Sequence, residues 1–256
     1  LAAVSLEDAL AWSPDGRFLA FTAALDNNSS DLYVLNTEQN RIDRLVGVST
    51  HSATPFWSPG STWLVSQELG KLTPTSPWRA ESVTGLRLPG YDAQNTLYLP
   101  ASGSVLETFV GWTNAHSFVS YSQTETGRQN LRQVDVETYT VRLIWSDALD
   151  LAAVDHPTGA LAYAISGEAG QSKNLLGGLY LLPADNSASR LIQTGAWQTL
   201  RADRGGQFIA TGMQGVLMVA PDGASLWLAN EHDASLAPNG TWIVAWGDDE
   251  SATAGG

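Results

Sequence analysis

The residues of this chain that could carry out chemistry are few and widely separated. The four histidines are His51, His116, His156 and His232. A histidine-based metal or catalytic site would need them to converge from distant segments, and we interpret each as a solvated turn or loop residue. The chain has no G-x-S-x-G, H-E-x-x-H or P-loop motif, and it has 0 cysteines to act as nucleophiles or thiolate ligands. We therefore predict no catalytic residue, no metal site and no cofactor.

The chain has two short acidic clusters, residues 26–31 and residues 248–250. The segment DNNSSD could offer calcium the oxygen ligands of Asp26, Asn28 and Asp31. It lacks the glycine and the terminal glutamate of an EF-hand loop, so calcium is an alternative that we do not favour. The run Asp248–Glu250 is interpreted as a solvated charge run in a polar tail.

Composition and charge exclude several classes of protein. The chain has 256 residues, of which 43% are hydrophobic and 15% charged, so it can build a core. Its 13 basic and 26 acidic residues give a net charge of -13, which opposes nucleic-acid binding. No apolar run reaches the roughly 18 to 20 residues of a membrane span, so we expect no membrane insertion. Because the chain starts at Leu1, we expect it to be a processed or excised piece.

The elements that must position any site come from a repeat. A segment of ten or eleven residues with an aromatic residue, a turn and alternating apolar residues occurs six times, at intervals of about 34 to 54 residues that bracket those of propeller blades. The copies are WSPDGRFLAF, WSPGSTWLVS, WTNAHSFVSY, VDHPTGALAY, ADRGGQFIAT and LAPNGTWIVAW. After most copies, a second pair of short alternating runs surrounds a turn rich in Asn, Asp, Gly or Pro. Two hairpins per repeat predict a four-stranded blade, and no segment has a convincing helical period.

The first copy, with Ser13-Pro14-Asp15-Gly16 before Leu19-Ala20-Phe21 and then Leu32-Tyr33-Val34, resembles the TolB-like (PD40, WD40-like) repeat. The later copies depart from this pattern, as in Gly60-Ser61 and Arg204-Gly205-Gly206. The resemblance implies a β-propeller over nearly the whole chain.

We predict an all-β, single-domain β-propeller of four-stranded blades over residues 1–256. Six blades are favoured over seven, and the ring is closed by pairing of the N- and C-terminal strands. Trp12, Trp57 and Trp112 are expected to pack between blades. The expected blades are 10–46, 55–99, 110–145, 152–192, 197–229, and 234–256 together with 1–4.

The binding surface is expected on one side of the ring. Loops that join the second and third strands of a blade, and loops that join successive blades, emerge on the same side, which we call the loop face. Loop residues are free to bind because the scaffold holds them. Trp78 either anchors an interface beside Arg79 or packs over its blade. The candidate partner-binding residues are His51, Trp78, Arg79, Arg128, Trp197 and His232.

The favoured function is a non-catalytic interaction module that presents these loops to a protein or peptide. The resemblance to TolB-like propellers implies a periplasmic or extracellular location, within a larger bacterial envelope or sensory protein. Two alternatives stay open. One is the substrate-gating propeller of a prolyl-oligopeptidase-type serine peptidase, and the other is a propeller enzyme acting at its central channel.

Overall fold

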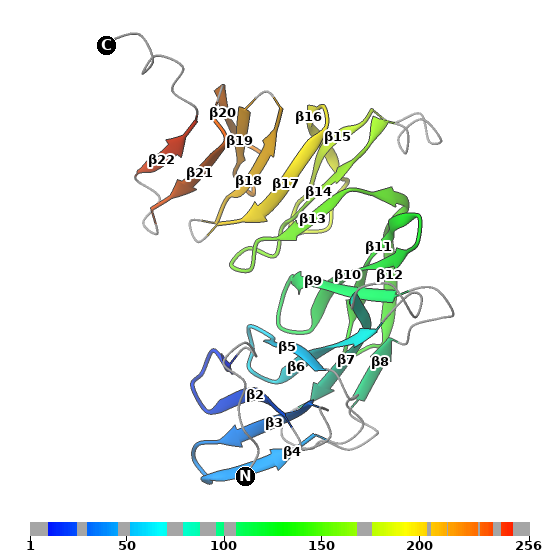
Figure 1. Cartoon of the computed structure of the whole chain (residues 1–256), viewed down its shortest axis with the longest axis vertical. Helices are drawn as coiled ribbons and strands as arrows, with labels where there is room; N and C mark the ends of the chain where they lie inside the picture. The colour runs from blue at the N-terminus through cyan, green and yellow to red at the C-terminus, as the bar shows by residue number, and fades with distance from the viewer. Residues whose placement is uncertain are drawn as a thin grey trace. The chain divides into compact units, whose positions relative to one another are not determined.

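The computed structural model describes residues 10–24, 30–45, 52–70, 79–87, 96–99, 106–167, 176–203, 206–213, 215–229, 231–237 and 242–247. The chain divides into two compact units, Leu1–Ser146 and Asp147–Gly256, each of which is described by itself. Every element whose bounds the structure gives is a β-strand (Figure 1). Within the described ranges, no helix has the length and apolar character needed to cross a bilayer.

The first unit contains three antiparallel sheets of four strands, each built from strands that are consecutive in sequence (Figure 1). The first sheet comprises β1 (Ala11–Trp12), β2 (Phe18–Ala24), β3 (Ser30–Asn36) and β4 (Arg41–Arg44). The second comprises β5 (Ser52–Trp57), β6 (Trp63–Gly70), β7 (Arg79–Arg87) and β8 (Thr96–Leu99). The third comprises β9 (Leu106–Trp112), β10 (Ser117–Thr124), β11 (Gly127–Asp135) and β12 (Thr140–Leu149).

The second unit contains two more four-stranded sheets and one two-stranded sheet. Its first sheet comprises β13 (Leu151–Val154), β14 (Leu161–Ile165), β15 (Gly178–Leu182) and β16 (Arg190–Thr194). The next comprises β17 (Trp197–Ala202), β18 (Phe208–Gly212), β19 (Gly215–Val219) and β20 (Ser225–Ala229). The last pairs β21 (Asp233–Leu236) with β22 (Ile243–Trp246).

The prediction of an all-β chain built from four-stranded antiparallel blades is confirmed, and the chain has the β-propeller fold. Closure of the ring and the number of blades stay predictions. Residues 1–4, which we expect to close the ring, and the polar tail 248–256 lie outside the described residues.

The same backbone hydrogen bond closes the first hairpin of every repeat. The residue after the aromatic or apolar position donates its N–H to a carbonyl four or five residues further along the chain. The six pairs are Ser13–Phe18, Ser58–Trp63, Thr113–Ser117, Asp155–Ala160, Asp203–Gln207 and Ala237–Trp242, with N···O distances of 2.7 to 2.9 Å. The repeat read from the sequence is therefore a repeat of backbone geometry.

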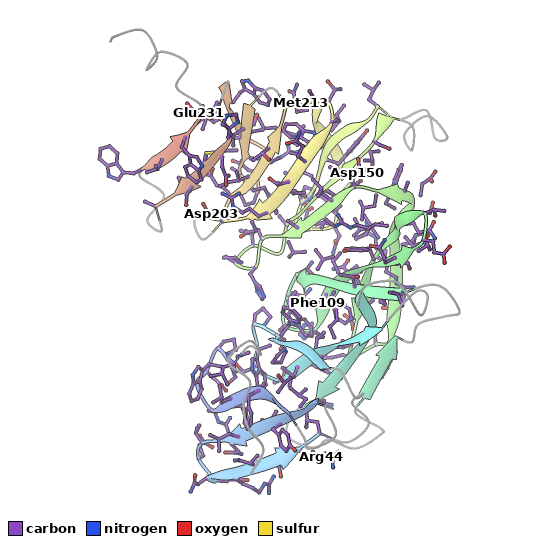
Figure 2. The ribbon with its side chains drawn as sticks, in the orientation of Figure 1. Arg44, Phe109, Asp150, Asp203, Met213 and Glu231 are labelled. Carbon is purple, nitrogen blue, oxygen red and sulfur yellow. The ribbon has the colours of Figure 1, made fainter. Side chains whose placement is uncertain are left out.

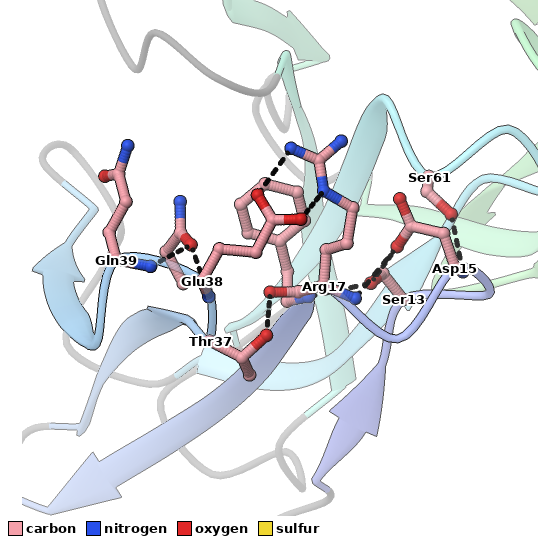
Figure 3. Close-up of polar contacts among 9 residues, drawn as sticks. Ser13, Asp15, Arg17, Thr37, Glu38, Gln39 and Ser61 are labelled. Atoms are coloured by element: carbon pink, nitrogen blue, oxygen red, sulfur yellow. Dashed lines mark hydrogen bonds and ion pairs between the residues drawn. The ribbon is translucent and has the colours of Figure 1, made fainter.

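Side chains hold the first of these turns in place (Figure 3). The Ser13 hydroxyl accepts the N–H of Phe18 at 2.9 Å and donates to Asp15 Oδ1 at 2.6 Å. Asp15 Oδ1 also accepts the N–H of Arg17 at 3.1 Å, as expected of a turn-forming aspartate. The bond from Ser13 is the main cause that lowers the pKa of Asp15 below its ordinary value. The Asp15 N–H donates to the Ser61 hydroxyl at 3.1 Å, which ties this turn to that of the next blade.

Two tryptophans wedge neighbouring blades of the first unit together, as predicted. Trp57 and Trp112 are 6% and 0% exposed. Each donates its indole N–H to the inner strand of the preceding blade, Trp57 to the Ala11 carbonyl at 2.7 Å and Trp112 to the Phe56 carbonyl at 3.1 Å. The same expectation is wrong for Trp12, which is 57% exposed, because in the described part of its unit no earlier blade covers β1.

One buried hydrophobic cluster of the second unit lies between its two four-stranded blades. All residues of β14, β15 and β19 are buried, so these strands are covered on both faces. The cluster between the blades contains Trp197, Phe208, Leu179, Leu181 and Leu217. Burying a large apolar side chain contributes roughly 1.5 to 3 kcal/mol, so this cluster provides a rigid base for the loops above it.

Candidate binding site on the loop face

Two kinds of loop lie side by side on the second unit. The segment Gly195–Ala196 connects β16 of one blade to β17 of the next. The turn after Gly212 connects the second and third strands of the later blade, where Gly212 pairs with Gly215. Trp197, the first residue of β17, also pairs with Gly212, so the two loops meet at one end of the sheet. Figure 2 labels Met213 at this end and Asp203 at the opposite end.

A pocket of about 410 Å³ opens where these loops meet. Its described lining is Gln193, Thr194, Gly195, Ala196, Trp197, Gly212, Met213 and Trp227. A second depression of about 530 Å³ adjoins it and shares Gln193 and Trp227, with Leu217 and Ser225 as further lining. We call the first of these the tryptophan pocket. The second depression lies between β16 and β20, which are the last strands of two adjacent blades.

Two indole rings form the wall of the tryptophan pocket. Trp197 and Trp227 contact edge to face, with ring centroids 6.1 Å apart and planes at 77°. Trp197 is 8% exposed and anchored in the core, whereas Trp227 is 39% exposed and Met213 is 88% exposed at the rim. Edge-to-face aromatic pairs add about 0.5 to 1.5 kcal/mol beyond area burial. The site therefore combines a fixed indole with a ring and a thioether that a ligand can reach.

Gly212 lets the fixed indole lie directly against the backbone. A Cβ atom at this position would lie 3.0 Å from the Ala196 carbonyl oxygen and 3.5 Å from Cε3 of Trp197. Gly195, in the neighbouring loop, has a φ of 130°, a conformation that only glycine adopts without strain. The two glycines shape the floor of the pocket.

Of the predicted binding residues whose side chains the structure describes, Trp197 is the one that lines the tryptophan pocket. It is not an exposed loop residue, because its ring is packed into the core between two blades. The His232 side chain is exposed in the second unit, and the backbone N–H of His232 donates to the Trp246 carbonyl at 2.8 Å.

The other predicted residues belong to the first unit. The Arg128 guanidinium lies over the ring of Tyr121, 5.5 Å from its centroid. Arg79 begins β7, and its side chain, together with His51 and Trp78, lies outside the described residues. The calcium candidates Asp26 and Asn28, and the side chain of Asp31, lie outside them as well.

Sequence reasoning missed Met213, Gln193 and Trp227. Met213 could have been found, because T-G-M-Q-G between two apolar runs indicates a tight turn that exposes its central side chain. Gln193 lies near the end of β16 and Trp227 at the middle of β20, and their meeting depends on how two blades pack. No short-range signal in the sequence shows that contact.

A buried ion pair in the first unit was also missed. The Glu107 carboxylate, 2% exposed, accepts two hydrogen bonds from the Arg132 guanidinium, one of them from Nε to Oε1 at 3.0 Å. The Ser122 hydroxyl lies 3.4 Å from Oε2, and the side-chain amide of Gln67 donates to the Glu107 carbonyl at 3.1 Å. Since Gln67 comes from the neighbouring blade, this cluster ties two blades together. Its contacts are satisfied within the protein, which indicates a structural role.

Comparisons with known proteins support the β-propeller fold. No protein-family model matches the chain. An uncharacterized peptidase, YuxL, from Bacillus subtilis is 38% identical over 61 residues, which is 23% of this chain and 9% of the peptidase. Dipeptidyl peptidase 4 from Porphyromonas gingivalis matches 93% of this chain with a TM-score of 0.61 and 14% identity, and the match covers 41% of that protein.

Two further solved structures are similar. A puromycin-hydrolyzing peptidase from Mycobacterium tuberculosis matches 90% of this chain with a TM-score of 0.57 and 16% identity, over 39% of its own length. TolB from Acinetobacter baumannii covers 94% of this chain and 54% of its own at a TM-score of 0.47 and 8% identity, too low to support a family assignment. The chain is thus a β-propeller that spans less than half of each of these three peptidases, and its membership of the TolB-like family stays a prediction.

Proposed function

We propose that this propeller is a non-catalytic binding module that holds a protein or peptide partner on its loop face. The observation that carries the proposal is the tryptophan pocket. It presents the partly exposed ring of Trp227 and the exposed thioether of Met213 above a rigid base. Tryptophan is enriched among the residues that dominate binding energy, and methionine adapts to varied partners. The described lining offers aromatic surface, an amide and a hydroxyl, which suit recognition of a polypeptide.

Selection from a random peptide library on the immobilised chain tests this function. The affinities of the enriched peptides are then measured for the wild-type chain, for Trp227→Ala and for Trp242→Ala. Trp242 is 75% exposed in the same unit but does not line the pocket, so its variant is the matched control. Loss of a binding hot spot weakens affinity about 30-fold or more, which we expect for Trp227→Ala alone. No enrichment, or equal binding to all three proteins, would contradict the proposal.

A second candidate function is the substrate-gating propeller of a serine peptidase. The partial match to a Bacillus subtilis peptidase and the fold shared with two other peptidases favour it. Sequencing the coding region on both sides of these 256 residues separates the candidates. An adjoining α/β segment with a G-x-S-x-G nucleophile elbow would favour gating, whereas an envelope anchor or sensory domain would favour the binding module.

The periplasmic or extracellular location is part of the first proposal and rests on the resemblance of the repeat to TolB-like propellers. Fractionation of the native host with an antibody against this chain tests it. Recovery in the periplasmic or secreted fraction is expected, and recovery only in the cytoplasm would contradict this location.

A further inference from the structure

The tryptophan pocket has a chemical character that points to one kind of ligand group. None of its described lining residues carries a charge. The available groups are the indole of Trp227, the thioether of Met213, the amide of Gln193 and the hydroxyl of Thr194. Indole faces attract cations through their quadrupole, and amide and hydroxyl oxygens accept hydrogen bonds. Such a lining suits a flat cation that also donates hydrogen bonds.

The net charge of the second unit favours the same ligand. Residues 147–256 contain 4 basic and 12 acidic side chains, for a formal net charge of -8. On the loop face of this unit, Asp150 precedes β13 and Glu231 follows β20, and Figure 2 labels Glu231 at the same end of the strands as Met213. A partner with positive charge would be drawn toward this face.

The described arginines of this unit do not compete for the pocket. The Arg190 guanidinium lies against the backbone of Gly223, in the turn between β19 and β20 at the opposite end of the blade. Arg201 is bound in an ion pair with Asp233 at 2.8 Å and donates to the Ala234 carbonyl. These two described guanidinium groups are therefore bound elsewhere, and neither occupies the pocket.

We propose that the tryptophan pocket binds an arginine side chain of a basic peptide segment in the partner. The guanidinium stacks on the Trp227 ring, and its N–H groups donate to the side-chain oxygen of Gln193, which lines both depressions together with Trp227. Arginine suits the site better than lysine because its planar guanidinium stacks on aromatic rings and is more weakly hydrated than the lysine ammonium group. This assignment rests on the proposed binding function and specifies the ligand class of the same site.

Three matched peptides test the assignment on the whole chain. They have the sequence acetyl-Gly-Ser-X-Ser-Gly-amide, where X is arginine, its neutral isostere citrulline or leucine. Binding is followed by indole fluorescence and by titration calorimetry. We expect the arginine peptide to bind about tenfold more tightly than the citrulline peptide, with a difference that shrinks as salt is added.

Variants localise the effect. Trp227→Ala is expected to abolish the preference for arginine, Trp227→Phe to retain part of it because phenylalanine keeps an aromatic face, and Trp242→Ala to leave it unchanged. Equal or tighter binding of the leucine or citrulline peptide would overturn the assignment, as would an arginine preference that survives in Trp227→Ala. So would the absence of saturable binding by the arginine peptide. If the library selection still yields ligands that depend on Trp227, the binding function stands while the arginine assignment fails.

Discussion

The indole nitrogen of Trp57 lies 2.7 Å from the carbonyl oxygen of Ala11, and this hydrogen bond joins the inner strands of two successive blades. The bond from Trp112 to Phe56 repeats it one blade later, at 3.1 Å. In both cases the acceptor is the residue immediately before the aromatic position of the preceding repeat. One residue type thus fills the space between blades and fixes their register, since the carbonyl defines where the ring must lie.

Trp57→Phe tests the contribution of this bond. The substitution keeps a buried aromatic ring but removes the indole N–H, so the Ala11 carbonyl loses this hydrogen bond. We expect a loss of about 1 to 3 kcal/mol in unfolding free energy, measured by urea titration. Trp12→Phe is the matched control, because Trp12 holds the equivalent repeat position at 57% exposure and should change stability by less than about 0.5 kcal/mol. Similar losses in both variants would show that the bond to Ala11 is not responsible.

The sequence predicts the repeated features because each of them is local. The pairing of Ser13 with Phe18 and the turn role of Asp15 depend on residues within one hairpin. Features that depend on contacts between strands far apart in the sequence could not be predicted from it. Trp197 and Trp227 belong to the first and last strands of one blade, and their ring contact requires the positions of the strands between them.

The ion pair of Glu107 and Arg132 shows the same limit. The residues lie 25 positions apart on β9 and β11, with β10 between them. The pairing of β9 with β10 shifts between Val119 and Ser120. An irregularity of this kind changes which side chains share a face, and alternation in the sequence does not show where it occurs.

Arg132→Met tests the cost of leaving a carboxylate buried without its partner. Glu107 is 2% exposed in its side chain, so loss of the guanidinium should destabilise the protein by about 3 kcal/mol. The double variant Glu107→Leu/Arg132→Met removes both charges and should recover most of that loss. Urea unfolding of the wild type, both single variants and the double variant gives the coupling energy. An additive cycle, with no recovery in the double variant, would contradict this account.

Asp15 provides a prediction about pH. Its bond from Ser13 lowers the pKa in the folded state, so the unfolded chain binds the proton more tightly than the folded one. The stabilisation is present above the unfolded pKa of about 3.9 and is lost as the pH falls through the lower folded pKa. Asp15→Asn keeps a turn-forming side chain without the charge. We expect it to be less stable than wild type at neutral pH and to converge with it in acid, as measured by urea unfolding at several pH values. A stability gap that stays constant with pH would contradict this assignment.

Gly212→Ala tests how tightly the floor of the tryptophan pocket is built. The added Cβ would meet the Ala196 carbonyl oxygen at 3.0 Å and the Trp197 ring at 3.5 Å, so the loop or the ring must move. Overpacking of this kind costs about 1 to 3 kcal/mol, and we expect a loss in that range together with a change in near-ultraviolet circular dichroism from the displaced indole. Gly167→Ala is the control, because a Cβ there meets no atom of the described residues within 4 Å. If the two variants unfold at the same urea concentration, the close approach of Gly212 to the Trp197 ring does not constrain the pocket.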